Sequence, residues 1–331
     1  MTRLRSLLAD RRVVIGLQIG FVVVFTAVLG YFLRDAWRDA LPLLEDADPA
    51  DIAIAVAALA AYYLLFVVGW MIILAGLGIR IGYPLALGAE MASMLAKYVP
   101  GTVWTPLARV LWLRRAGIRD TPVVVSSIAI EAGISAIAGV VVFAVGAAWV
   151  GASPAVLAGL VCFAVLVAVL LHPALFTRIL TAIFARFGGG EIPPLTYRRM
   201  VLLLGYYAMT WLVGGVALLF LIRSLGDDPG WSTVPYLGGT AAVGAIVTVL
   251  SVFAPSGLGV REASMYGLLL AVTTSSVALG VTVLNRLAIT LVEAALLAVG
   301  VVYWSIRRRM GADPGSGAWP EPEAGRRTTE A

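Results

Sequence analysis

Eight ionisable residues lie inside or directly beside long apolar runs of the sequence. An ionised side chain at the centre of a membrane helix costs about 2.5–3.5 kcal/mol on insertion scales, so eight unpaired charges would cost on the order of 20–28 kcal/mol. These groups must therefore pair with one another or line a water-filled cavity. The cations are Lys97, Arg109, Arg261 and Arg286, and the anions are Glu90, Glu131, Glu262 and Glu293.

Most of these charges gather at two interruptions of the apolar pattern. Each interruption carries a proline and then a glycine, and an arginine follows shortly after. Non-helical backbone at membrane depth is tolerated only where it is buried in protein or lines a cavity, and broken helices offer free N–H groups to an anion. We therefore predict a phosphate-binding site at these breaks. Its predicted residues are Lys97, Tyr98, Pro100, Gly101, Trp104, Arg109, Glu131, Pro255, Gly257, Gly259, Arg261, Glu262 and Arg286.

The acidic residues have two readings. Within the predicted site, Glu131 and Glu262 would hold the arginines in place when no ligand is bound, or titrate if transport is coupled to protons. Glu90 and Lys97 are seven residues apart, two turns of one short helix, so we expect both side chains on one face. The alternative is that the charges are structural ion pairs that fix the packing of the helices. A purely structural role is most expected for Glu293.

No pattern typical of an enzyme or a metal site is found in the sequence. The single histidine, His172, lies beside Pro173 at a helix end, and the single cysteine, Cys162, lies in an apolar run, so nucleophilic catalysis and a thiolate cluster are not expected. A Walker-type loop and a dinucleotide fingerprint are both absent from the sequence. The net charge of +5 comes from arginines at loop ends, which argues against nucleic acid as a partner. We therefore expect no cofactor.

The elements that must position these residues are membrane-spanning helices. Of the 331 residues, 61% are hydrophobic and 13% are charged, whereas a soluble domain carries about 25% charged residues. A helix needs about 20 apolar residues to cross a hydrocarbon core of about 30 Å. Seven runs reach or nearly reach that length: Val13–Leu33, Ile52–Leu77, Val123–Val150, Pro154–Leu171, Val201–Ile222, Val234–Phe253 and Val277–Trp304.

Two further apolar stretches are too short or too broken for a simple crossing. We expect residues 84–112 to enter and leave the membrane on one side as a re-entrant hairpin, and residues 253–273 to form a broken segment whose part 260–272 completes a crossing. The likeness of the two breaks suggests an inverted repeat. The predicted fold is an all-α polytopic bundle of about seven to eight transmembrane helices. It occupies residues 1–310 and is followed by a disordered tail at 311–331.

The arginines predict the orientation of this bundle. Four segments together hold 19 basic residues: 1–12, 78–122, 172–200 and 305–331. The segments 34–51 and 223–235, by contrast, hold three basic and eight acidic residues. By the positive-inside rule the first four segments face the cytoplasm. Both termini of this multi-pass protein are therefore expected on the cytoplasmic side of the cell membrane.

Several of these segments together resemble a known family, that of the lysylphosphatidylglycerol synthase transmembrane region. The resemblance covers roughly residues 13–305. It implies a lipid flippase fold, which in bifunctional members moves aminoacylated phosphatidylglycerol to the outer leaflet after a separate soluble domain has made that lipid. Because the chain ends in a polar tail, we expect no synthase domain and no aminoacyl transfer. The resemblance rests on Lys97-Tyr98-Val99-Pro100-Gly101 with Arg109, on Glu131, on Pro255-Ser256-Gly257-Leu258-Gly259-Val260-Arg261-Glu262, and on Asn285-Arg286.

These inferences predict a protein that is not an enzyme but moves an anionic lipid between the leaflets of the membrane. The lipid would be a polyprenyl-phosphate-linked sugar or an aminoacylated or otherwise modified phospholipid. Its partners would be membrane lipids and a lipid-modifying or glycosyl transferase. The alternatives are a carrier of a small soluble anion and a membrane scaffold without transport activity. The spacing of Gly238 and Ala242 would allow helices to pack within one chain or in a homo-oligomer.

Overall fold

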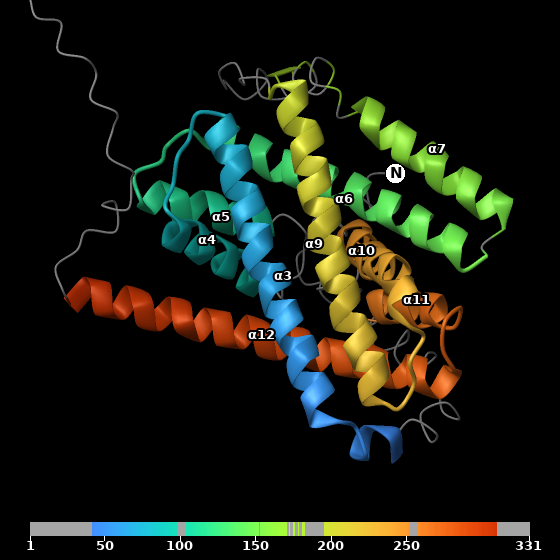
Figure 1. Ribbon diagram of the computed structural model, residues 1–331. Helices are drawn as coiled ribbons and strands as arrows, with labels where there is room; N and C mark the ends of the chain where they lie inside the picture. Colours follow the sequence, from blue (N-terminus) through green and yellow to red (C-terminus); the bar gives the residue numbers. More distant parts are fainter. Residues whose placement is uncertain are drawn as a thin grey trace, which may run out of the picture.

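The computed structural model describes residues 42–97, 104–151, 153–170, 172, 175, 178, 181–182, 195–251, 257 and 259–309. Every regular element in these ranges is a helix (Figure 1). The helices are α3 (Pro49–Gly76), α4 (Tyr83–Ala96), α5 (Trp104–Arg115), α6 (Thr121–Trp149), α7 (Pro154–Leu170), α9 (Tyr197–Ser224), η1 (Trp231–Thr233), α10 (Val234–Leu250), α11 (Val260–Leu269) and α12 (Ser275–Arg309).

Five segments within the described ranges are long and apolar enough to cross a membrane: α3, α6, α9, the η1–α10 segment and residues 275–300 of α12. The chain is therefore an all-α, multi-pass membrane protein, as the sequence predicts. Helix α7, expected to be a crossing, contains 17 residues. The expected first crossing at 13–33 and the tail at 311–331 lie outside the described residues.

Prolines and aspartates mark where several helices begin. Proline occupies the first or second position of α3, α4, α6 and α10, where its missing N–H breaks no helical hydrogen bond. The Asp48 carboxylate accepts a hydrogen bond from the Ala50 N–H (2.8 Å), and the Asp120 carboxylate accepts one from the Val123 N–H (3.3 Å). These caps satisfy N–H groups that the helix leaves free. They fix the starts of α3 and α6.

Helices α4 and α5 pack side by side as the expected hairpin. The Trp112 ring on α5 lies against Gly88 on α4, where an added Cβ would come within 2.8 Å of it. The Arg109 guanidinium, nearer the start of α5, contacts Glu90, nearer the end of α4. These two contacts show that the helices run antiparallel.

Helices α10 and α11 form a second hairpin, which differs from the crossing expected around residues 260–272. The Tyr236 hydroxyl, near the start of α10, donates to the Leu268 carbonyl near the end of α11 (2.8 Å). At the other end of the pair, Thr248 lies against Gly257. The ten residues of α11 span about 15 Å, half of the hydrocarbon thickness. The chain therefore returns along α10, an arrangement that differs from the continuous crossing expected around residues 260–272.

The chain uses one arrangement twice, a helix followed by a hairpin and a second helix. α3 packs against α4 and α6, and α9 packs in the same way against α10 and α12. The two copies are inverted because α3 and α9 run antiparallel (Figure 1). The Asp48 N–H donates to the Ser224 carbonyl at one end of this pair (2.9 Å), and Arg199 Nη1 donates to the Gly76 carbonyl at the other (3.3 Å). These contacts and directions are those that an inverted repeat would have.

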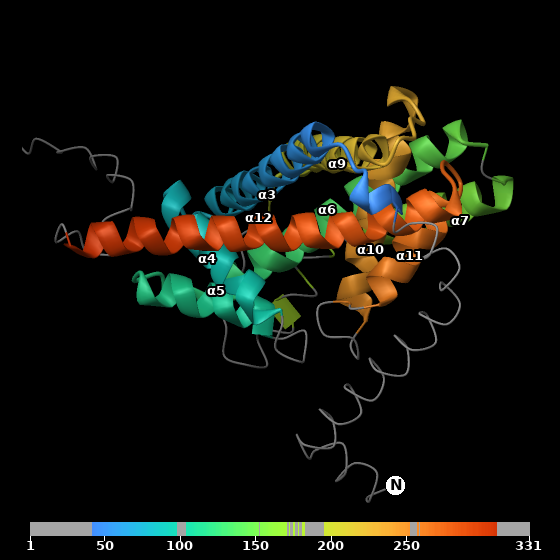
Figure 2. The same cartoon turned by 90° about the horizontal axis from the view of Figure 1, so that it is seen from below.

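The second hairpin is held by close contacts between helix backbones. A Cβ added to Gly238 would lie 2.5 Å from the Trp211 carbonyl of α9, and one added to Gly139 of α6 would lie 2.4 Å from Ala242. Small residues allow membrane helices to approach this closely. Gly238 and Ala242 therefore serve packing within the chain. Seen from below, α12 lies along both hairpins, with α3 and α9 beyond it (Figure 2).

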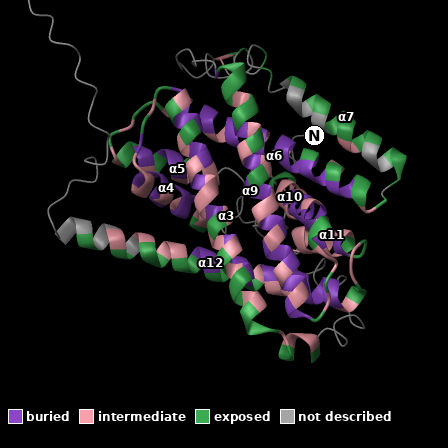
Figure 3. Cartoon of the chain, viewed as in Figure 1, coloured by how far each residue is buried: buried purple, intermediate pink, exposed green. Residues whose placement is uncertain are grey.

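The outer surface of the bundle is apolar, as a lipid-facing surface should be. Buried positions line the inner faces of α6, α9 and α10, whereas α7 and much of α12 are exposed (Figure 3). The exposed large side chains there include Val165 and Leu166 on α7 and Leu287 and Leu291 on α12. A continuous apolar surface of this kind marks a contact with membrane. The buried residues, by contrast, include several charged groups, among them Glu90, Arg109, Glu131 and Glu293.

Candidate functional site

Two of the charged residues pair where the end of α4 meets the middle of α12. Lys97 caps the C-terminus of α4, and its Nζ forms an ion pair with Glu293. The Tyr63 hydroxyl from α3 donates to the same carboxylate (2.7 Å). The Glu293 side chain is 7% exposed, but the Lys97 side chain is 22% exposed. The Glu293 side chain is therefore enclosed, whereas part of the Lys97 side chain remains accessible.

A second pair joins α11 to α12 beside the first. Glu262 Oε2 accepts the Gly259 N–H (2.7 Å), which caps the N-terminus of α11. Glu262 Oε1 receives Arg286 Nη1 of α12 at 3.3 Å. One carboxylate thus fixes both the start of α11 and the position of an arginine. Each of its two oxygens therefore has one of these partners.

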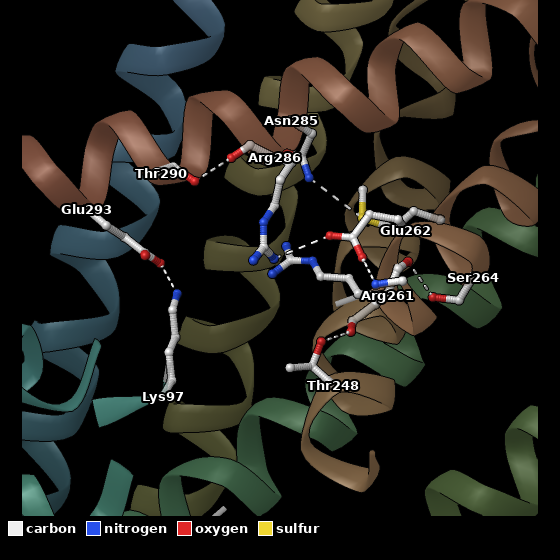
Figure 4. A network of polar contacts seen from close by, with 12 residues as sticks. Lys97, Thr248, Arg261, Glu262, Ser264, Asn285, Arg286, Thr290 and Glu293 are labelled. Carbon is white, nitrogen blue, oxygen red and sulfur yellow. Dashed lines mark hydrogen bonds and ion pairs between the residues drawn. The ribbon is translucent and has the colours of Figure 1, made fainter. Parts of the chain in front are cut away.

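Arg261 supplies a third cation to the same place. Its stem passes Gly244 of α10, where an added Cβ would lie 3.4 Å from Arg261 Cγ. Figure 4 shows the guanidinium groups of Arg261 and Arg286 pointing toward one another, on the side that faces Lys97 and Glu293. Among the described residues, no carboxylate lies within ion-pairing distance of Arg261.

We call these five residues the basic cluster: Lys97, Arg261, Glu262, Arg286 and Glu293. Its three cations face two carboxylates, which leaves one positive charge over in the described part of the chain. Like charges held close together in a poorly solvated place repel one another and favour a bound anion. Arg261 also lies in the first turn of α11, where the helix dipole adds partial positive charge.

The remaining three charges form a separate group, the acidic cluster of Glu90, Arg109 and Glu131. Arg109 Nη2 contacts Glu90, and Arg109 Nη1 contacts Glu131 Oε2 at 2.5 Å. All three residues are buried, and the guanidinium lies 4.7 Å from the centre of the Trp70 ring. The cluster therefore contains two carboxylates for one cation.

The predicted site residues thus fall into two groups. Lys97, Arg261, Glu262 and Arg286 come together in the basic cluster. Arg109 and Glu131 belong instead to the acidic cluster, and Trp104 begins α5 with 42% of its surface exposed. Gly257 and Gly259 lie at the start of α11. Tyr98, Pro100, Gly101 and Pro255 lie outside the described residues.

The sequence reading did not include the aromatic partners of the two clusters. Tyr63 donates to Glu293 (2.7 Å), and the Tyr207 hydroxyl of α9 donates to Glu131 Oε1 (3.3 Å). Trp70 covers the Arg109 guanidinium. The sequence signal for these partners is a tyrosine or tryptophan in the middle of an apolar run, because a buried hydroxyl or indole N–H needs a hydrogen-bond partner.

Two glycines shape the backbone before α11. Gly257 and Gly259 have φ values of +67° and +82°, a left-handed conformation that side chains with a Cβ disfavour. A Cβ at Gly257 would also lie 2.5 Å from Thr248 Oγ1. Glycine is therefore needed here for both conformation and space, and it directs the chain into α11 and its Arg261.

Replacing Gly257 by alanine is expected to lower the stability of the protein by about 1–3 kcal/mol, the usual cost of such a strained backbone. The measurement is the midpoint of thermal unfolding in detergent. Gly267→Ala is the matched control, since Gly267 is helical, lies in the same hairpin and has open space around it. Equal midpoints for the two variants would contradict the assigned role of Gly257.

Among the described residues, no group of three histidine, cysteine, aspartate or glutamate side chains is placed to hold a metal ion. Apart from the exposed pair of Arg223 and Asp228, the ion pairs among the described residues belong to the two clusters above. What they can do chemically is bind an anion at the basic cluster and bind a proton at the acidic one.

Comparison with known proteins bears on this arrangement. A search of curated proteins returned no match. The family model of the lysylphosphatidylglycerol synthase TM region matches residues 13–305, which include both clusters and both hairpins. The chain therefore belongs to the lysylphosphatidylglycerol synthase TM region family.

Proposed function

We propose that this protein is a lipid flippase that moves an anionic lipid between the two leaflets of the cell membrane, with the phosphate of the headgroup bound at the basic cluster. The observation that carries the proposal is the surplus of cations there. Lys97, Arg261 and Arg286 face only two carboxylates among the described residues. Membership of a membrane-domain family associated with lipid flipping supports the same function.

The position of the basic cluster suits a headgroup that must cross the membrane. Lys97 ends an arm of the first hairpin and Arg261 begins an arm of the second. The two hairpins belong to inverted halves, so they enter the membrane from opposite sides. A phosphate bound between them would contact one hairpin from each half. A site at the interface of two inverted repeats is typical of transporters that work by alternating access.

Each residue of the basic cluster has a distinct part in this mechanism. The guanidinium groups of Arg261 and Arg286 donate hydrogen bonds to phosphate oxygens, and Lys97 adds a point charge. Glu262 and Glu293 hold Arg286 and Lys97 while the site is empty. The lipid phosphate then competes with these carboxylates, so binding and release stay reversible. The acyl or prenyl chain remains in the surrounding lipid as the headgroup crosses.

The substrate class that fits is a lipid with a phosphate headgroup, either a polyprenyl-phosphate-linked sugar or a modified phospholipid. We further propose that the basic segments 1–12, 78–122, 172–200 and 305–331 face the cytoplasm, because they hold 19 of the basic residues. A transferase that modifies the headgroup on that side would supply the substrate.

The test is lipid flipping in reconstituted vesicles. Purified protein is placed in vesicles of phosphatidylcholine and phosphatidylglycerol that contain fluorescent NBD-phosphatidylglycerol, and dithionite bleaches the outer leaflet. Arg261→Ala is expected to slow flipping at least about tenfold, because a hydrogen bond to a charged group contributes about 1.5–3 kcal/mol. Arg114→Ala, an arginine exposed on the last turn of α5, is the matched control and should flip at the normal rate.

Folded Arg261→Ala protein that flips as fast as the unaltered chain would refute this site. Uptake of radiolabelled inorganic phosphate into the same vesicles, without any lipid flipping, would show instead that the protein carries a soluble anion.

A further inference from the structure

The acidic cluster contains more negative than positive groups, and the proposed function assigns no role to this imbalance. Two carboxylates contact opposite nitrogens of one guanidinium, Glu90 at Arg109 Nη2 and Glu131 at Arg109 Nη1. The three side chains are between 5% and 9% exposed. If both carboxylates are ionised, one negative charge is left over at a place that water hardly reaches.

An uncompensated charge in such a place costs several kcal/mol, and the usual relief is a change of protonation. Two carboxylates that share a site cannot both ionise easily, so one of them keeps a proton, and the proton belongs to the pair. The arginine cannot provide this relief, because guanidinium groups stay protonated in proteins.

Two unsatisfied atoms point to the same conclusion. Glu90 Oε2 contacts the guanidinium as an ion pair, yet no described residue gives it a well-aligned hydrogen bond, and the Nε of Arg109 also lacks a described acceptor. A buried charged oxygen normally collects several donors. A neutral carboxylic acid demands fewer donors, so the few donors around the two carboxylates suit a pair that keeps one proton.

The neighbouring elements add no second cation to this cluster within the described residues. From α9, the Tyr207 hydroxyl donates to Glu131 Oε1 (3.3 Å). From α3, Trp70 covers the guanidinium and Tyr62 lies within electrostatic range of both carboxylates. On α4 the Ser93 hydroxyl donates a hydrogen bond to the Glu90 backbone carbonyl, and Lys97 forms an ion pair with Glu293 of α12.

We propose that Glu90, Arg109 and Glu131 form a proton-binding site in which the two carboxylates share one exchangeable proton. With the proton bound, the cluster is neutral, and without it the cluster carries one negative charge. Glu90 of the acidic cluster and Lys97 of the basic cluster lie about 10 Å apart along α4, so the two clusters are electrostatic neighbours. An anion that arrives at the basic cluster therefore favours the protonated form of the acidic cluster. This linkage to transport rests on the proposed function, whereas the proton site itself does not.

Infrared spectroscopy of the full chain in lipid vesicles tests the proton site directly. A protonated carboxylic acid has a C=O stretching band that an ionised carboxylate lacks, and this band shifts in heavy water. The unaltered protein should show one such buried acid that titrates with pH. The band should disappear in Glu90→Gln and also in Glu131→Gln, because either change leaves one carboxylate on one guanidinium. Glu262→Gln is the control and should keep the band, since Glu262 belongs to a one-to-one pair with Arg286.

The absence of a titrating buried acid in the unaltered protein, or a band that survives both Glu90→Gln and Glu131→Gln, would overturn the proposal. Two separate variants are used, so that poor folding of one does not prevent a decision. The flipping assay distinguishes the two ideas. Protein that shows the band but flips no lipid removes the proposed function and leaves the proton site standing. Protein that flips lipid but lacks the band removes the proton site and leaves the proposed function standing.

Discussion

Arg109→Met is expected to destabilise the protein by about 3–5 kcal/mol, the typical cost of removing one partner from a buried ion pair. The change leaves Glu90 and Glu131 facing each other without a cation, and both are buried. It also removes the guanidinium that lies over the Trp70 ring. Methionine keeps a long flexible side chain, so the effect comes mainly from lost charge and not from a cavity.

The measurement is the fraction of monodisperse protein that remains after heating in detergent. Arg114→Met is the control, because it makes the same exchange at an exposed position on the same helix. Glu90→Gln should cost far less than Arg109→Met, since it leaves a balanced pair of Arg109 and Glu131. An Arg109→Met protein that is as heat-resistant as the control would show that the acidic cluster contributes little to the fold.

The second large effect concerns Lys97, where structural and functional roles can be separated. Lys97→Met should destabilise the protein by about 1–3 kcal/mol, because the buried Glu293 carboxylate then loses the ion pair with Lys97. The effect is smaller than at Arg109 because the Lys97 side chain is 22% exposed. We also expect lipid flipping to fall at least about tenfold, as for a lost hydrogen bond to a charged group.

The double variant Lys97→Met with Glu293→Gln separates a structural role of Lys97 from a role in binding phosphate. It removes both charges, so stability should return to within about 1 kcal/mol of the unaltered protein. Flipping of NBD-phosphatidylglycerol should stay low, because the cation that attracts the phosphate is still missing. Recovery of stability and flipping together would mean that Lys97 and Glu293 form a purely structural pair.

The sequence predicts the membrane helices well because their signal is local. The long apolar runs at 52–77 and 123–150 correspond closely to α3 and α6, since length and hydropathy alone decide whether a helix can cross a bilayer. The interruptions between the helices of each hairpin also carry local sequence signals, namely prolines and glycines. The direction that the chain takes after such an interruption has no local signal. For this reason the sequence predicts a crossing around residues 260–272, whereas α11 runs back along α10.

The sequence predicts that the buried charges must pair, but not which residues form each pair. Glu90 and Lys97 share a face of α4, as their spacing indicates, but seven residues place them about 10 Å apart along the helix. At that distance they meet different helices. Glu90 contacts Arg109 of α5, and Lys97 contacts Glu293 of α12. Which helix lies at each level depends on the packing of the whole bundle, and one sequence contains no local signal for it.

The inverted repeat has an electrostatic consequence. Taken separately, each half is neutral inside the membrane: Glu90, Lys97, Arg109 and Glu131 cancel in the first half, and Arg261, Glu262, Arg286 and Glu293 cancel in the second. The separation into a positive and a negative cluster arises because Lys97 reaches across the junction to Glu293. With both carboxylates of the acidic cluster ionised, the protein therefore holds one positive and one negative cluster only while its halves are docked. A motion that withdraws Lys97 from Glu293 would remove the surplus positive charge of the basic cluster, and with it the charge that attracts an anion.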